Sequence, residues 1–239
     1  MVNWFGRRRR RVAVPRLKSR GEKPTNINRV DLAELTPDVL RFLGQAAYVQ
    51  LSIFETLTGA LALAPNASAK ESIAAVADLS LNKQRGIVAE LTRLKKDAGQ
   101  EMEQYAGRID YFRTATTGAD WSEKLISAYV TAGILDDFYR RLATGLPTDV
   151  AERVEAIYSA PSGAELLQAQ ILAAIDADDH LSSRLAMWGR RLVGDTLLIA
   201  RSGLALPQTT ASDEARLEPV FTELIAAHTR RMDALGLTA

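Results

Sequence analysis

Long helix-forming segments, separated by proline- and glycine-containing turns, make up almost the whole chain after residue 30. The four longest cover roughly residues 37–63, 69–96, 121–144 and 180–204. Each would span about 35–40 Å at a rise of 1.5 Å per residue. Alternating runs of β-branched and aromatic residues between tight turns are nearly absent. The sequence therefore predicts an all-α protein, a four-helix bundle with additional short helices and a C-terminal helix.

Polar motifs indicate where the helices begin. Thr36, followed by Pro37 and Asp38, predicts the first helix, because a capping hydroxyl, a proline and an acid all suit a helix N-terminus. Similar signals are expected to open later helices at Ser68 with Glu71, at Asp120, and at Ser162 with Glu165. Shorter helices are predicted near 100–114, 149–158 and 162–176, and the last near 214–234, with Pro219 confining its regular part to the residues after this proline. We expect the segment 145–179 to be decoration on the bundle.

Charge divides the chain into two parts. Residues 1–30 carry ten basic side chains and one acid, a net charge of +9, whereas the other 209 residues carry 20 basic and 28 acidic groups, a net charge of −8. Five adjacent arginines repel one another and bury nothing. We therefore expect a flexible basic arm at 1–30 and one bundle domain at 31–239.

Three interpretations of the arm stay open. The arm is a solvated tail in the first. In the second it binds RNA: Trp4 stacks on a base, and the phosphates are bound by Arg7, Arg8, Arg9, Arg10 and Arg11. In the third the same residues bind an anionic membrane.

Composition excludes several kinds of chemistry. The chain has no cysteine, so it has no disulfide, thiolate metal site or cysteine nucleophile, and its two histidines leave little scope for histidine-rich metal sites. Phosphate-binding glycine loops and the Gly-x-Ser-x-Gly elbow are missing. Because no apolar run approaches the roughly 20 residues of a membrane span and no secretory signal is present, we expect a cytoplasmic protein.

Ionisable residues on apolar helix faces are the candidate site. Glu55, Asp136 and Asp137 lie in apolar runs of the first and third long helices, and Arg191 and Asp195 are four residues apart on the fourth. Two interpretations are open: a dimetal centre bridged by the carboxylates, or a buried network in which an arginine neutralises them. The Glu-x-x-His pairs typical of di-iron bundles are absent, which favours the ion-pair network.

Three stretches resemble a known family. Residues 30–48 with Glu55 beyond them, 132–142 and 184–195 are similar to an actinobacterial group of ferritin-like proteins, described as similar to the tRNA 2-methylthio-isopentenyl-adenosine hydroxylase family of nonhaem di-iron enzymes. The resemblance covers about residues 30–205 and implies a ferritin-like four-helix bundle. It implies that Glu55 and either Asp136 or Asp137 stand where carboxylate ligands would be, and that Arg191 and Asp195 stand where a Glu-x-x-His pair would project.

We therefore expect a non-catalytic ferritin-like bundle with a degenerate di-iron site and no cofactor. It would serve as a binding or scaffold protein, with RNA or a ribonucleoprotein as partner through the basic arm. The alternative is a di-iron tRNA hydroxylase-like oxygenase that holds two iron ions with an atypical carboxylate ligand set. A structural homo-oligomer is the third hypothesis.

Overall fold

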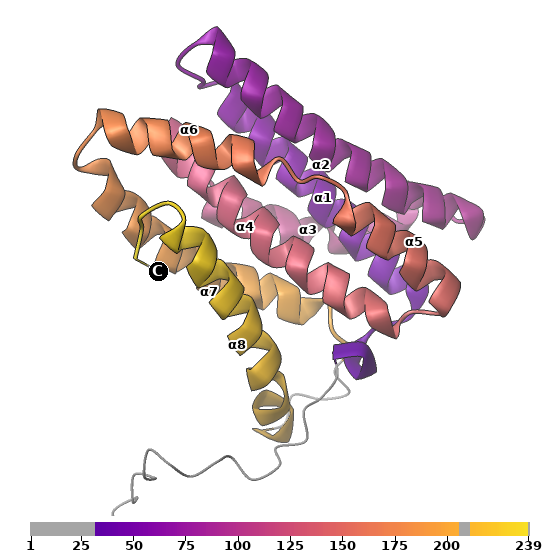
Figure 1. The fold of residues 1–239 in the computed structure, drawn as a ribbon. Coiled ribbons are helices and arrows are strands. Elements are labelled where there is room, and N and C mark those ends of the chain that lie inside the picture. The colour runs from indigo at the N-terminus through magenta and orange to yellow at the C-terminus, as the bar shows by residue number, and fades with distance from the viewer. Residues whose placement is uncertain (1–31, 206–210, 239) are drawn as a thin grey trace, which may run out of the picture.

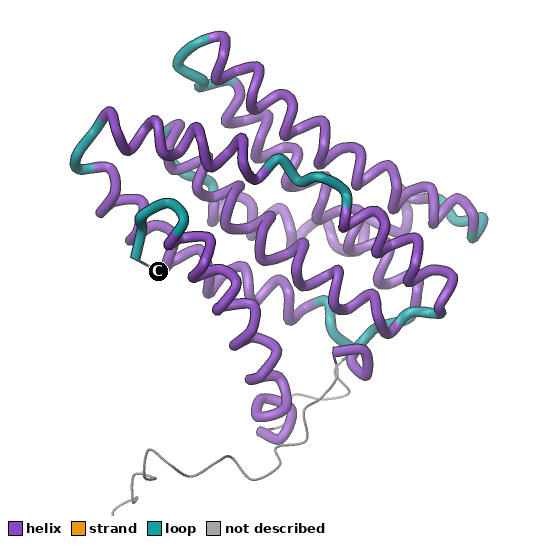
Figure 2. Tube along the Cα trace, viewed as in Figure 1, coloured by secondary structure: helices purple, strands orange, loops and turns teal. Residues whose placement is uncertain are grey.

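The computed structural model describes residues 32–205 and 211–238, and the described part contains helices and loops without a strand (Figures 1 and 2). The prediction of an all-α fold is confirmed. The helices are α1 (Val39–Leu61), α2 (Ala67–Arg93), α3 (Ala98–Thr116), α4 (Trp121–Leu142), α5 (Thr148–Ser159), α6 (Ala164–Ala177), α7 (Leu181–Ser202) and α8 (Ala211–Asp233). Two short 3-10 turns, η1 (Leu32–Leu35) and η2 (Ala143–Gly145), pack against each other near the start of α1 and the end of α4.

Helices α1 and α4 form the centre of the molecule and pack directly on each other. On one side, α2 packs on α1, α6 packs on α4, and α2 contacts both α5 and α6, which closes a four-helix bundle. Helices α5 and α6 run end to end along α4 and together act as its fourth member (Figure 1). On the other side, α3 packs on α1 and α7 packs on α4.

The segment 145–179 packs directly on α2 and α4, so it forms one side of the molecule and is more than peripheral decoration. The long helix near 180–204, α7, lies on the opposite side of α4 and also contacts α3, which closes a second four-helix arrangement that shares α1 and α4. Pro161 lies in the break between α5 and α6, so the fourth member of the bundle consists of two short helices.

Helix starts follow the capping chemistry of the sequence with small shifts. The Asp120 carboxylate accepts a hydrogen bond from the Glu123 backbone N–H at 2.9 Å, as predicted. Helix α2 is capped by Asn66, whose side chain accepts from the Ala69 backbone, and not by the predicted Ser68. Asp38 caps α1 by accepting from the Arg41 backbone N–H at 3.1 Å, and the Thr36 hydroxyl donates to the Leu142 carbonyl at 2.7 Å.

Aromatic side chains join α1, α4 and α5 in the bundle core. The Phe42 and Tyr139 rings meet edge to face with centroids 5.6 Å apart, and Tyr139 and Tyr158 stack at 6.2 Å. Both Phe42 and Tyr139 are fully buried. Rings of this size dominate the apolar area that a core removes from water, so this cluster fixes α5 against the central helices.

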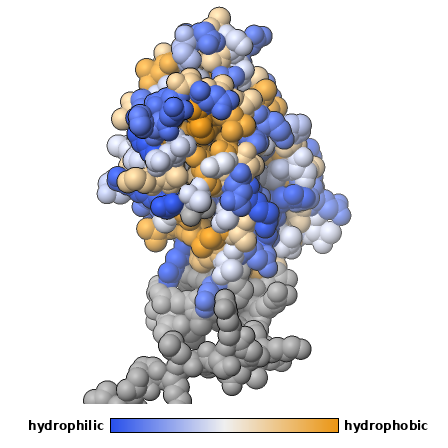
Figure 3. Space-filling model, turned by 60° about the vertical axis from the view of Figure 1, so that its left-hand side comes forward, coloured by the Kyte–Doolittle hydropathy of each residue, from blue (hydrophilic) through white to orange (hydrophobic). Residues whose placement is uncertain are grey.

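Helix α8 crosses the bundle on α4 and α7 (Figure 1). It begins at Ala211, so it continues through Pro219, and the prediction that its regular part lies after this residue was wrong. Its inner side buries Leu224, His228 and Met232. Seen from the side where α6, α7 and the C-terminal turn lie, the surface mixes apolar and hydrophilic residues (Figure 3). Within the described ranges, no helix combines the length and apolar character needed to cross a membrane.

Candidate functional site

A buried ion pair lies between α2 and α4 in the centre of the four-helix bundle. The Lys83 ammonium is 2.5 Å from Oδ2 of Asp136, and the lysine side chain is 4% exposed. The Gln50 amide of α1 donates to the other carboxylate oxygen of Asp136 at 2.7 Å. Three helices of the bundle thus contribute a side chain to one polar cluster, and both oxygens of its carboxylate are engaged.

Two hydroxyl groups lie next to this cluster. Ser80, one turn before Lys83 on α2, donates to the backbone carbonyl of Gln50 at 3.1 Å. The Tyr158 ring of α5 lies 6.0 Å from the Lys83 ammonium, near the limit for a cation–π contact. Burial, and then the negative charge of Asp136, raise the pKa of Tyr158 well above its ordinary value, so this phenol stays protonated.

A small cavity opens over the ion pair. It has a volume of about 150 Å³ and is lined by Lys83, Asp136, Tyr158 and the small residues of α4 and α6, Ala132, Gly133 and Ala164. These small side chains leave room above the carboxylate. Asp137 and Arg231 line the same cavity and form an ion pair between α4 and α8, so they stand at its outer end.

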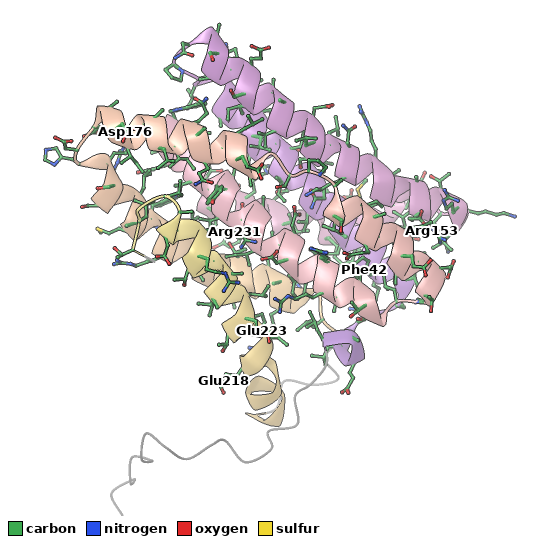
Figure 4. All side chains as sticks on the ribbon, viewed as in Figure 1. Phe42, Arg153, Asp176, Glu218, Glu223 and Arg231 are labelled. Atoms are coloured by element: carbon green, nitrogen blue, oxygen red, sulfur yellow. The ribbon has the colours of Figure 1, made fainter. Side chains whose placement is uncertain are left out.

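The position of Arg231 depends on Gly133. A Cβ atom on Gly133 would lie 2.9 Å from Nε of Arg231, closer than carbon and nitrogen atoms pack. The absent side chain lets the arginine cross α4 to reach Asp137, one turn further along this helix. Figure 4 labels Arg231 on α8, where this helix crosses α4.

Beyond Arg231 lies an open groove between α4, α5 and α8, with a volume of about 730 Å³. Four arginines line it: Arg140, Arg141, Arg230 and Arg231. Arg140 contacts Glu155 of α5 through Nε at 2.8 Å and Nη2 at 2.6 Å. This pair raises the pKa of Arg140 and lowers that of Glu155, in both cases first through the hydrogen bond between them. Arg141 pairs with Glu223 of α8, labelled in Figure 4.

The family model for the actinomycete ferritin-like domain matches residues 34–206, which include α1 to α7. The chain belongs to this ferritin-like family. No curated protein matches the chain significantly. The match supports the ferritin-like fold that the sequence resemblance implied, whereas the similarity to tRNA hydroxylases stays a prediction.

The ferritin-like domain separates the acids that the sequence analysis grouped in its core. Glu55 is 44% exposed and pairs with Arg113 of α3 at 2.9 Å, so the prediction of a buried carboxylate was wrong. Glu55 and Gln50 are five positions apart on α1, about 140° around the helix. Because Gln50 faces Asp136, Glu55 faces a different side, between α1 and α3.

Two further candidates lie on α7, outside the bundle that contains Asp136. Arg191 is exposed, with its guanidinium carbon 5.3 Å from the Trp188 ring, and Asp195 is half-buried. Neither forms an ion pair with a described residue. The expectation that Arg191 neutralises the carboxylates was wrong, because α7 packs on the opposite side of α4. Lys83 compensates Asp136, and Arg231 compensates Asp137.

Lys83 was not identified from the sequence, although its spacing from the apolar residues of α2 indicates a buried position. The buried positions of α2 include Ile73, Val76, Ser80, Lys83 and Ile87, which alternate in steps of three and four residues. This spacing is that of a helix face turned toward a partner. A lysine in such a register predicts a buried partner for its charge.

The donor set in this ferritin-like core differs from that of an iron pair. A carboxylate-bridged pair takes carboxylates and imidazoles from four helices, whereas here Asp136 is joined by an ammonium and an amide. Among the residues that the structure describes, no three carboxylates or imidazoles gather closely enough to hold a metal ion. Trp4 and Arg7 to Arg11, the candidates for RNA binding, lie outside the described residues.

Proposed function

We propose that this chain is a non-catalytic member of the ferritin-like family that acts as a binding or scaffold protein. One observation carries the proposal: the Lys83 ammonium lies against Asp136 at the centre of the four-helix bundle. A positive charge fixed on the protein offsets the carboxylate there. With Gln50 on the second oxygen, the carboxylate has its partners within the chain.

Physical chemistry supports the stability of this arrangement. A buried carboxylate without a partner is expensive, and removing one member of a buried pair costs about 3–5 kcal/mol. A metal ion approaching Asp136 would have to displace the ammonium and leave it buried near the new positive charge. We therefore propose that the ion pair of Lys83 and Asp136, and not a metal ion, is the polar centre of the bundle.

Metal analysis of the full chain tests this part of the proposal. The protein would be purified from iron-supplemented cells without chelators, and its iron content measured by inductively coupled plasma mass spectrometry. We expect far less than one iron per chain, in the wild type and in Lys83→Met alike. Iron close to two per chain would contradict the proposal and support the di-iron oxygenase instead.

For the partner, we propose RNA, bound through the basic arm. The support is the net charge of +9 on residues 1–30, compared with −8 on the rest of the chain, and the five arginines at 7–11 that follow Trp4 in the sequence. Guanidinium groups match phosphate oxygens and are always charged. Deletion of residues 1–12 should abolish RNA binding, and the affinity of the intact chain should fall steeply with salt as counterions are released.

The control for this deletion replaces Arg7 to Arg11 with glutamine in the full chain, which keeps the length and removes the charge. Both variants are expected to lose binding in a filter-retention or fluorescence-anisotropy assay. Unchanged affinity in either variant would contradict the role of the arm.

A further inference from the structure

The groove between α4 and α8 combines several guanidinium groups with few carboxylates. Four arginines line it, Arg140, Arg141, Arg230 and Arg231, and all of them except Arg230 are paired with a carboxylate among the described residues. The structure assigns this groove as a binding site for a phosphate group, and we propose that Arg141 and Arg230 are its principal contacts. This inference rests on the proposed binding function and names the chemistry that a second site on the bundle would recognise.

Arg230 is the first reason for the assignment. It is exposed on α8, lines the groove, and forms no ion pair with any residue that the structure describes. The neighbouring Arg231 points across Gly133 toward Asp137. These successive residues of α8 thus face different directions: Arg231 is paired, and the charge of Arg230 faces solvent.

The second reason is the number of N–H donors that the existing ion pairs leave unused. A guanidinium group has five N–H donors, and Arg141 engages Glu223 through Nη1 alone. Both side chains of this pair are well exposed, at 40% and 55%. Exposed ion pairs contribute little to stability, so an incoming phosphate competes with Glu223 for Arg141 at low cost.

The third reason is the match between groove and ligand. Pockets for small ligands have volumes of about 300–1,000 Å³, and this groove has about 730 Å³. Phosphate oxygens accept bidentate, charge-assisted hydrogen bonds from arginine. Tyr129, the aromatic side chain among the described lining residues, is 5% exposed and offers no open ring face for a base. The groove therefore recognises the phosphate group, whether it comes from a small phosphate or from an RNA backbone.

The experiment uses the full chain with Arg7 to Arg11 replaced by glutamine, so that the basic arm does not bind the probe. Isothermal titration calorimetry at low salt measures the affinity for inorganic pyrophosphate, and fluorescence anisotropy measures the affinity for a short oligouridylate. In this background, Arg230→Gln and Arg141→Gln should each weaken binding by about tenfold, the usual effect of losing a charged hydrogen bond.

Two further variants sharpen the test. Glu223→Gln frees Arg141 from its carboxylate and should tighten binding by up to about fivefold, the range of an exposed ion pair. Arg108→Gln is the matched control, because Arg108 is also exposed but lies on α3, which does not pack on α8. It should leave the affinity unchanged. Circular dichroism would verify that each variant is as helical as the parent chain.

The two probes distinguish the source of the phosphate. Pyrophosphate binding that depends on Arg230 supports a site for small phosphates, and Arg230-dependent binding of the oligouridylate alone supports the RNA backbone. Binding of neither probe, or equal effects of Arg230→Gln and Arg108→Gln, would overturn the assignment. Stoichiometric iron in the core would instead refute the non-catalytic function, a separate measurement that leaves the groove result standing.

Discussion

The ammonium group of Lys83 and the carboxylate of Asp136 face each other across the bundle interior, 2.5 Å apart, on α2 and α4. These helices are linked by α3 and are far apart in the sequence, so the pair forms only when the bundle is assembled. The Gln50 amide completes the contacts of the carboxylate from α1. This relationship makes the stability of the fold depend on one lysine.

Replacing Lys83 by methionine should therefore destabilise the protein strongly. The variant removes the cation from Asp136, whose side chain is 17% exposed, and we expect the free energy of unfolding to fall by up to about 3–5 kcal/mol, the range for a fully buried pair. Urea-induced unfolding followed by circular dichroism measures the change. Lys70→Met is the matched control on α2, because Lys70 is exposed, and it should stay within about 0.5 kcal/mol of the wild type. The double variant Lys83→Met/Asp136→Leu should recover most of the loss; equal effects of the two single lysine variants would contradict the role of the pair.

Two glycines, on α4 and α7, let α8 pack closely on these helices. Alanine at either position should weaken the packing of α8. A Cβ on Gly189 of α7 would lie 2.7 Å from Cε of Met232, which is fully buried, and a Cβ on Gly133 would meet Arg231. We expect Gly133→Ala to lose about 1–3 kcal/mol, as overpacked cores do, and Gly189→Ala to lose less, because Cε is the free end of a flexible side chain. Limited proteolysis should cut more rapidly at the C-terminal end of the chain.

The control for this substitution is Gly107→Ala. Gly107 is exposed in the middle of α3, and a Cβ there would have no neighbour within 4 Å. Because glycine weakens a helix interior by about 0.5–1 kcal/mol relative to alanine, this variant should be more stable than the wild type. Stabilisation by Gly189→Ala as well would show that Met232 adjusts freely.

Acidification should destabilise the protein through His228. This residue is 2% exposed on α8, and neither ring nitrogen has a hydrogen-bond partner among the described residues. Burial, and then the charge of Arg231, lower its pKa below the ordinary value of 6.5. The unfolded chain therefore binds a proton at a pH at which the native state does not, so stability falls as the pH drops below about 6.5.

The variant His228→Leu isolates this effect from the titration of carboxylates. The free energy of unfolding, measured in urea at several pH values between neutral and mildly acidic, should fall less steeply with acid in the variant than in the wild type. Parallel pH profiles of the two proteins would contradict the assignment of this dependence to His228.

The start of α4 offers a test of the capping chemistry. The Asp120 side chain accepts from the Glu123 backbone and pairs with Arg184 of α7 at 2.6 Å. Asp120→Ala should cost about 1–2 kcal/mol in urea-induced unfolding, since it removes the cap. Asp120→Asn keeps a capping oxygen and removes the ion pair, so it should cost less than about 1 kcal/mol. Equal losses in the two variants would indicate that the ion pair, and not the cap, stabilises the helix start.

Local signals predicted most of the helices because each depends on a few neighbouring residues. The Asp120 cap and the break after Leu61 follow from side-chain and backbone preferences that act within one turn. The sequence did not indicate which helices pack on each other, because this depends on contacts between distant segments. In the structure the interrupted pair α5–α6 packs with α2 on one side of α1 and α4, and α7 packs with α3 on the other side.

The candidate site was predicted in part for a similar reason. Asp136 was identified because a carboxylate in an apolar run is conspicuous, and the structure places it in a buried pair. Its partner was not identified, because a lysine in a moderately polar helix is typical of a solvent-facing position. Glu55 was misplaced because apolar neighbours on both sides of it do not specify which side of α1 meets α3.

Helix α8 lies beyond the residues that the family model matches, yet it supplies one wall of the arginine-lined groove. The groove thus combines Arg140 and Arg141 of the matched domain with Arg230 and Arg231 from beyond it. Because α8 also buries Leu224, His228 and Met232, a chain that ended after residue 206 would lose part of its core together with this wall of the groove. The helix outside the family match therefore contributes both to the stability of the interior and to the charge of the surface.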